Sequence, residues 1–226
     1  MGSFFGKITV ETPEYEILTR HDEANLEIRS YGPRYEAYVT SSDFPEAESE
    51  AKFTTLAFTT LAKYIGVMSK PQNKDQETQM PESIPMTAPV VMSCSSHEDA
   101  KFSPTAMPLL KGSNAGEESM AFILPHKFIV DSHDPPEPQD KRVHVRKISG
   151  EVVAVQTFSG AASPEQSAQR ASDVVDIVDQ IFHTKFEVER NESGDPLWSF
   201  RGYNAPFVIP CFRTNEVAIQ VKSKSG

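Results

Sequence analysis

Apolar and polar residues alternate along short stretches in both halves of the chain, which is the pattern of half-buried β-strands. Residues that favour turns separate these stretches. In the second half, two of the stretches form a predicted hairpin around Ser149 and Gly150. The predicted strands cover residues 15–19, 26–30, 35–40, 90–93, 120–124, 143–148, 152–158, 185–189, 197–203 and 217–221.

Each half also contains one segment with apolar residues at the three- and four-residue spacing of an amphipathic helix. The first helix is expected over residues 45–64, after the capping pair Ser42-Asp43 and before Gly66. The second is expected over residues 163–182. Their apolar stripes consist of Phe53, Leu56, Ala57, Thr60, Leu61, Tyr64 and Ile65, and of Ala171, Val174, Val175, Val178, Ile181 and Phe182. Strands and helices together predict an α+β fold.

The same order of elements occurs twice, at a spacing of 117 residues. The repeated segments are LEIR at 26–29 and VHVR at 143–146, YEAYVT at 35–40 and VVAVQT at 152–157, and APVV at 88–91 and APFV at 205–208. We therefore expect a duplicated β-β-α-β unit that forms a distorted antiparallel β-barrel with two long helices and a pseudo-two-fold axis. Such a pair of halves predicts a groove for an apolar ligand between them.

The 226 residues are expected to form a single domain, because neither half alone covers its own sheet. The repeat halves comprise about residues 15–93 and 120–221. Two polar stretches, about residues 69–83 and 97–118, are expected to be mobile loops.

Composition and charge exclude several classes of function. The net charge of −10, with scattered basic residues, argues against nucleic-acid binding, which requires a basic surface. No apolar run approaches the roughly 20 residues of a membrane span. Lys7 and Glu11 lie where a signal peptide needs an apolar core, so a cytoplasmic protein is expected. We also expect a monomer.

Two pairs of residues occupy equivalent positions in the repeat. Cys94 and Cys211 are too few for a disulfide framework and are expected to be reduced thiols in the core. Arg29 and Arg146 are expected to be structural cations. Their predicted partners are Glu11, Glu14 or Glu36.

The chain contains no recognisable catalytic pattern. GxSxG, Walker and GxGxxG motifs are missing, so neither a catalytic residue nor an enzymatic activity is predicted. The histidines lack the HxH and HExxH spacings of metal ligands, so no metal site is predicted, and each is expected at the surface. These histidines are His21, His97, His126, His133, His144 and His183.

Several short motifs occur in the order found in the SOUL/heme-binding protein family. They are LEIRSYGP at 26–33, the helix segment at 53–66, IPMTAPV at 84–90, FILP at 122–125 with PPEP at 135–138, FSG at 158–160, and YNAP at 203–206 with RTNEV at 213–217. The chain resembles this family over about residues 15–221, and a plant-type cytosolic member is expected. It departs from the family pattern in the long insertion at residues 97–118.

The resemblance implies a distorted antiparallel β-barrel of two pseudo-symmetric halves. It also implies non-covalent binding of heme and other free tetrapyrroles, as a cytosolic buffer or carrier, without chemistry on them. One branch of the family leaves the iron without a protein ligand, and another has a proposed histidine ligand immediately before the Tyr-Gly-Pro segment. Because Ser30 occupies that position here, we expect heme to bind without an axial histidine.

A tetrapyrrole needs a flat apolar wall and cations for its two propionates. The resemblance implies that the first helix supplies them: Phe58 and Ala62 form an apolar strip, and Lys63 matches a basic residue of the family's groove. An arginine of that groove falls on Thr55, for which Lys52 is the candidate substitute. The predicted site consists of Thr55, Phe58, Ala62, Lys63 and Met68, with Lys52 as a second propionate partner.

Two questions stay open at this point. Met68, just past the first helix, either closes the pocket, serves as a soft axial ligand or simply packs. Two further classes of function also fit the sequence: a tetrapyrrole-modifying enzyme, and an effector-binding or regulatory protein whose groove takes other amphipathic molecules.

Overall fold

The computed structural model describes residues 8–93, 118–131, 133–204 and 213–224. The strands are β1 (Tyr15–His21), β2 (Leu26–Tyr31), β3 (Arg34–Thr40), β4 (Asn73–Lys74), β5 (Val90–Ser93), β6 (Ser119–Ile123), β7 (Glu137–Pro138), β8 (His144–Ile148), β9 (Glu151–Ser159), β10 (Phe186–Val188), β11 (Trp198–Gly202) and β12 (Thr214–Ser223). The helices are α1 (Glu50–Ile65), α2 (Lys127–Val130) and α3 (Pro164–Ile177), and α3 continues as a π-helical turn over Val178–Phe182.

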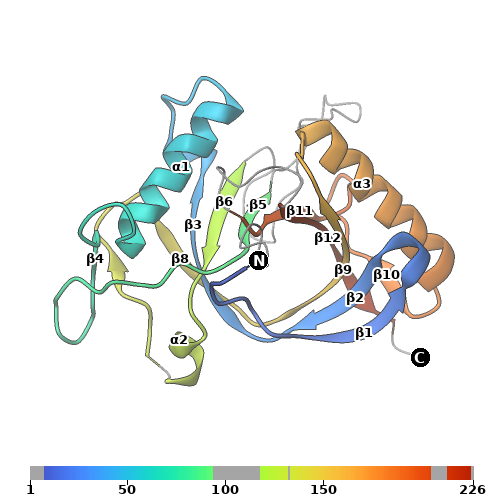
Figure 1. The fold of residues 1–226 in the computed structure, drawn as a ribbon, viewed down its shortest axis with the longest axis horizontal. Coiled ribbons are helices and arrows are strands. Elements are labelled where there is room, and N and C mark those ends of the chain that lie inside the picture. Colours follow the sequence, from blue (N-terminus) through green and yellow to red (C-terminus); the bar gives the residue numbers. More distant parts are fainter. Residues whose placement is uncertain (1–7, 94–117, 132, 205–212, 225–226) are drawn as a thin grey trace, which may run out of the picture.

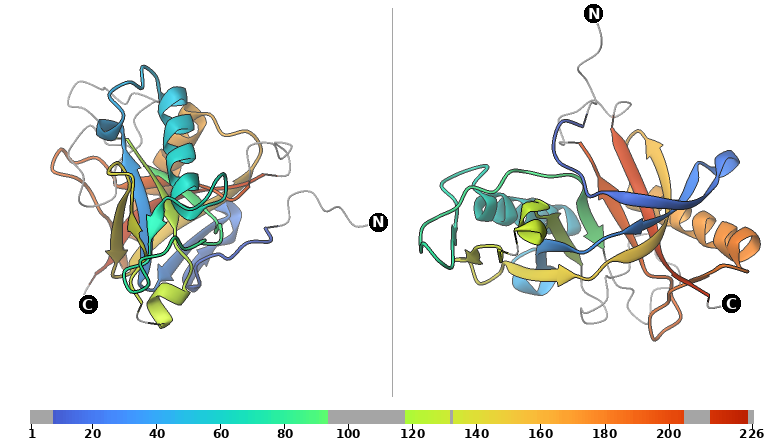
Figure 2. Two further views of the ribbon diagram at one scale, coloured as in Figure 1. Left: turned by 90° about the vertical axis from the view of Figure 1, so that its left-hand side faces the viewer. Right: turned by 90° about the horizontal axis from the view of Figure 1, so that it is seen from below.

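Ten of these strands form one antiparallel sheet, in the order β1-β2-β9-β12-β11-β5-β6-β3-β8, with β10 attached to β12. The sheet curls strongly around itself, and α1 and α3 lie outside it on opposite sides (Figure 1). The view from below shows the same separation of the two helices (Figure 2). The predicted α+β fold, with two long helices on a curled antiparallel sheet, is confirmed.

The duplication is visible in the register of the strands. Glu27 in β2 lies opposite Val155 in β9. The repeat equivalent of Glu27 is His144, 117 positions later, and that of Val155 is Tyr38, 117 positions earlier. His144 and Tyr38 lie opposite each other between β8 and β3. Each pair of the β3–β8 ladder has such a counterpart in the β2–β9 ladder. The two halves are therefore related by a pseudo-two-fold axis.

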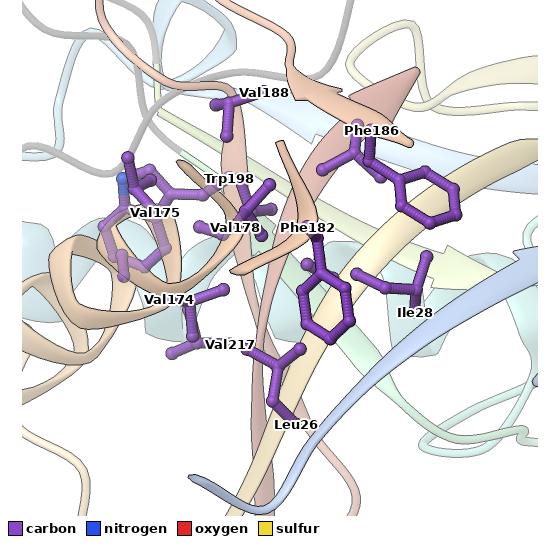
Figure 3. Close-up of a cluster of buried hydrophobic side chains, with 14 of the residues drawn as sticks. Leu26, Ile28, Val174, Val175, Val178, Phe182, Phe186, Val188, Trp198 and Val217 are labelled. Carbon is purple, nitrogen blue, oxygen red and sulfur yellow. The ribbon is translucent and has the colours of Figure 1, made fainter. Parts of the chain in front are cut away.

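Each long helix covers its own hydrophobic core. Under α1, buried apolar side chains of the helix, such as Phe53 and Leu61, pack on Val39 and Phe122 of the sheet. Under α3, the helix packs on strands β2, β9, β11 and β12 (Figure 3). The labelled side chains of this second core are Leu26, Ile28, Val174, Val175, Val178, Phe182, Phe186, Val188, Trp198 and Val217. Both cores consist of side chains on the helix-facing side of the sheet, and the side chains on its opposite face belong to neither core.

The start of the first helix differs from the prediction. The helix begins at Glu50, because the Ser49 side chain accepts a hydrogen bond from the Lys52 backbone N–H. The predicted capping pair Ser42-Asp43 instead belongs to a short 3₁₀ turn, in which Asp43 accepts from the Thr40 N–H. The predicted end is confirmed: Gly66 adopts a left-handed conformation at φ 87°.

Residues 69–83, predicted to be a loop, include the short strand β4, which pairs with β7. The mobility of this segment stays a prediction. Three predictions fall outside the described residues. They concern the loop at residues 97–118, of which only Glu118 is described, the repeat segment at residues 205–208, and both cysteines. No helix within the described part of the chain is long and apolar enough to cross a membrane.

The tight turn between β8 and β9 generates a first prediction. Gly150, between β8 and β9, has φ 124°, and a Cβ atom there would lie 2.9 Å from the backbone oxygen of Tyr31. Gly150→Ala is expected to lower the free energy of unfolding by about 1–3 kcal/mol, measured by urea denaturation. Gly32→Ala is the control, because a Cβ atom at Gly32 meets nothing within 4 Å. Equal stability of the two variants would contradict this expectation.

Candidate functional site

The face of the sheet opposite the helices, called the inner face below, carries charged side chains. Side chains alternate between the two faces of a strand. Ile28 and Ala154 pack under α3. Arg29 is one residue from Ile28, and Glu151 is three residues from Ala154. Because both offsets are odd, Arg29 and Glu151 point to the inner face. The inner-face ion pairs involve Arg29, Arg34, Arg146 and Arg201 with Glu27, Glu36, Glu151 and Glu216.

Arg34 and Glu151 connect the two halves within this network. They are repeat equivalents, 117 positions apart, and Arg34 Nη2 lies 2.9 Å from Glu151 Oε1. Arg34 also pairs with Glu36 at 2.9 Å, and Arg201 Nη2 donates to Glu151 Oε1 at 2.6 Å. Glu36 has no solvent exposure and also accepts two hydrogen bonds from Arg146. Five charged residues, Arg34, Arg146, Arg201, Glu36 and Glu151, are thus held together in one network.

The paired charges stabilise each other's ionised forms. Burial by itself raises the pKa of Glu151, but Arg201 and Arg34 outweigh it and hold that pKa below its ordinary value. Burial likewise lowers the pKa of Arg201, and Glu151 reverses the effect so that the pKa is raised. Two guanidinium nitrogens, Arg34 Nη1 and Arg201 Nε, are buried without a hydrogen-bond partner among the described residues.

The predicted partners of the equivalent arginines are partly right. Arg146 pairs with Glu36, as expected. Arg29 pairs instead with Glu27 and Glu216, both at 2.8 Å. Glu36 was one of the three predicted partners, and the pairing of β3 with β8 places it directly opposite Arg146. The sequence pattern contained no signal for Glu216, because β12 reaches β2 only through the intervening strand β9.

A cavity of about 420 Å³ opens beside the link between β2 and β3. Glu11, Glu14 and Glu16 lie along it, together with Tyr15 and the buried Arg34. A second cavity of about 290 Å³ is lined by Arg34 and residues of the β8–β9 turn. The carboxylates of the first cavity make it unfavourable for the two propionates of a tetrapyrrole.

The structure distributes the predicted site residues over α1 and its C-terminal end. Thr55 is exposed, and its hydroxyl donates to the Ala51 carbonyl at 2.9 Å. Phe58 is half-buried, with its ring edge-on to Phe122 at 5.4 Å between centroids. Ala62 is only 1% exposed. Its side chain therefore packs in the core and offers no outer surface to a ligand.

The basic residues and the methionine of the predicted site are accessible. Lys63 is half-exposed and lies near Asp140. The hydrogen bond from Arg142 is the main cause of the lowered pKa of Asp140, and Lys63 adds to it. Lys52 is exposed and lies 3.8 Å from the Glu48 carboxylate. Met68 is 61% exposed, so it does not pack in the core.

Among the described histidines, sequence reasoning missed one cluster. His133 Nε2 lies 2.9 Å from Asp75 Oδ2, and Glu82 completes a group whose ligand atoms all lie within 4.8 Å of one another. His133 is 51 residues beyond Glu82 in the sequence, and the three residues match no short motif, so spacing alone could not find them.

The fold and these surfaces define an α+β protein with pseudo-two-fold symmetry, a charged inner face and two helices exposed outside. A model of the SOUL heme-binding protein family matches residues 10–220. The chain therefore belongs to this family, as its motifs predicted.

Among solved structures, the chain is similar to an uncharacterized conserved protein from Listeria innocua, with a TM-score of 0.51 and 13% identity over 88% of this chain and 93% of that one. A hydrolase from Listeria innocua matches with a TM-score of 0.47 and 9% identity over 88% and 92% of the two chains. The first likeness shows the fold alone. The comparison with curated proteins found no match.

The inner face generates a second prediction. Glu151→Gln leaves Arg34 and Arg201 without their shared carboxylate and is expected to cost roughly 3–5 kcal/mol of stability at neutral pH, measured by urea denaturation. The exposed substitution Glu48→Gln is the control and should change stability by less than about 0.5 kcal/mol. If Glu151→Gln lowered stability as little as Glu48→Gln, the ion pairs of Glu151 with Arg34 and Arg201 would not be needed for stability.

The same pair predicts a dependence of stability on pH. Because the pKa of Glu151 is lowered in the folded state, its contribution is present above its unfolded pKa of about 4.3 and is lost as the pH falls through the folded pKa. Wild-type protein should therefore lose stability in the acid range below about pH 4, and Glu151→Gln should lose less. Denaturation midpoints at a series of pH values test this, and parallel curves would contradict it.

Proposed function

We propose that the protein binds heme and other free tetrapyrroles non-covalently, as a cytosolic buffer or carrier. The observation that carries the proposal is the match of residues 10–220 to a heme-binding family. The family is known for binding heme rather than for an enzymatic activity, and this supports a binding protein. The plant-type assignment and the monomeric state stay predictions.

We place the ligand on the outer side of α1. The half-buried ring of Phe58 supplies an apolar contact, and Lys63 and Lys52 supply cations from the same helix. Lys63 keeps capacity for a propionate, because its neighbour Asp140 is already held by two hydrogen bonds from the Arg142 guanidinium. Met68, exposed beyond the end of α1, is available to cover one edge of the ring.

The size of the apolar contact predicts modest affinity. Burial of roughly 400 Å² of ring surface contributes about 10 kcal/mol. Association costs roughly 4–15 kcal/mol, so micromolar binding is expected without a bond to the iron. None of the described histidines lies on α1, and the family position of the proposed histidine ligand is Ser30. We therefore expect high-spin iron with water or an open axial position.

The two alternative functions find less support in the geometry. An enzyme that opens the ring or removes the metal needs a free acid or base, whereas the inner-face carboxylates Glu36, Glu151 and Glu216 are held by arginines. A cationic effector entering the curled sheet would meet the same neutralised carboxylates. Binding on the outer surface of α1 avoids both difficulties.

Substituting the proposed propionate partner tests the location. Lys63→Glu is expected to weaken hemin and protoporphyrin binding by roughly 1–3 kcal/mol, because it replaces an attractive charge with a repulsive one. Lys185→Glu makes the same charge change at an exposed position beyond α3 and should leave affinity unchanged. Both affinities follow from titrations of the Soret band. If neither ligand binds wild-type protein at tens of micromolar, the proposed function is wrong.

The spectrum of the bound iron tests the coordination. Alanine substitution of each histidine should leave both the Soret band and the affinity unchanged, and the spectrum should be high-spin. A low-spin spectrum that disappears with one of these substitutions would refute the proposed coordination and move the site away from α1. The substitutions cover His21, His97, His126, His133, His144 and His183.

A further inference from the structure

Two segments distant in the sequence meet beside the C-terminal end of α1. Strand β4 in residues 69–83 pairs with β7, which belongs to the proline-rich connection before β8. Asn73 is fully buried and donates to the Tyr64 and Glu82 carbonyls. The Tyr64 hydroxyl donates to the Pro136 carbonyl at 2.8 Å. These bonds fix the two segments against each other and against the helix.

Asp75, Glu82 and His133 converge where these segments meet. Their ligand atoms all lie within 4.8 Å of one another, and His133 Nε2 is 2.9 Å from Asp75 Oδ2. Asp75 is 7% exposed. The group combines one imidazole nitrogen with two carboxylate oxygens from two segments, so it is more than a cluster of acidic residues.

The surroundings orient both inner ligands. Asp75 Oδ1 accepts from the Thr78 backbone N–H at 2.6 Å and from the Thr78 hydroxyl at 2.7 Å, which leaves Oδ2 directed at His133. The same bonds are the main cause of a pKa of about 2 for Asp75, so the carboxylate is ionised. On the other side of the imidazole ring, Nδ1 lies 4.0 Å from Glu77 Oε1. This distance is longer than a hydrogen bond, so the ring is oriented by its contact with Asp75.

We propose that Asp75, Glu82 and His133 bind a divalent transition-metal ion of the Zn²⁺ type. Calcium and magnesium prefer ligand sets made of oxygen alone, whereas Zn²⁺ takes imidazole together with carboxylates. With bonds of about 2.1 Å, ligand atoms around a tetrahedral ion lie about 3.4 Å apart. Binding would therefore widen the 2.9 Å contact of His133 with Asp75 and adjust the other separations, which are at most 4.8 Å, and water would take the fourth position.

Lys127 competes with the metal ion for the same carboxylate. Its ammonium lies 2.5 Å from Glu82 Oε1, and its side chain is 43% exposed. The ammonium can therefore move into solvent when the ion binds. In the bound form the ion would join residues 69–83 to the connection that contains His133, next to the end of α1. This site is independent of the proposed tetrapyrrole site.

Calorimetric titration of Zn²⁺ into untagged, chelator-treated protein tests the proposal. One Zn²⁺ per chain is expected, with affinity reduced at least about tenfold in His133→Ala and in Glu82→Gln. His144→Ala is the matched control, because His144 Nε2 lies 3.2 Å from Asp43 Oδ1 and no third ligand among the described residues joins that pair. Lys127→Met should bind Zn²⁺ several-fold more tightly, since it removes the competing ammonium.

Other results would overturn the site. Zn²⁺ binding that persists unchanged in His133→Ala, for example at the thiols of Cys94 and Cys211, would show that the cluster is only an ion pair between two segments. Equal losses in His133→Ala and His144→Ala would have the same meaning. Co²⁺ substitution adds a direct readout: intense d–d absorption bands indicate a four-coordinate site, and they should be lost in His133→Ala. Hemin titration is unaffected by any of these outcomes.

Discussion

The ion pair between Arg34 and Glu151 holds the curled sheet together at its pseudo-two-fold axis. The two residues are equivalents in the repeat, so each half contributes one charge of the pair. A buried ion pair gains little over apolar packing, but a single buried charge without its partner is strongly destabilising. Arg34 also pairs with Glu36, and Glu151 also pairs with Arg201, so the contact between the halves joins an ion pair of one half to an ion pair of the other. The two halves are thus joined by charges as well as by the strand pairing of β2 with β9 and of β3 with β8.

The charged inner face also determines where a ligand can bind. Each inner carboxylate is held by at least one arginine, and the cavity beside the β2–β3 link is lined by further acidic residues. A planar dianion would meet the carboxylates of Glu11, Glu14 and Glu16 in that cavity. The proposed site on α1 combines Phe58, whose half-buried ring packs against Phe122, with the two lysines Lys52 and Lys63.

The end of α1 is the most highly constrained part of that exterior. Gly66 ends the helix, and hydrogen bonds of Tyr64 and Asn73 attach the two following segments to it. Asp75, Glu82 and His133 lie on these segments, and Met68 lies just before the first of them. The hydrogen bonds of Tyr64 and Asn73 therefore hold the candidate metal ligands near the end of α1.

The sequence by itself determined the α+β class, the duplication and most element positions, because strand alternation, helical periodicity and the spacing of 117 residues are local or repeated patterns. The family followed from motifs in order. The start of α1 at Glu50 is set by a local cap at Ser49 that the sequence prediction did not select. Tertiary structure alone decided the burial of Ala62 and the partners of Arg29. These depend on which side chains meet across non-adjacent strands and turns. These contacts depend on the curl of the sheet, so no local pattern in the chain predicts them.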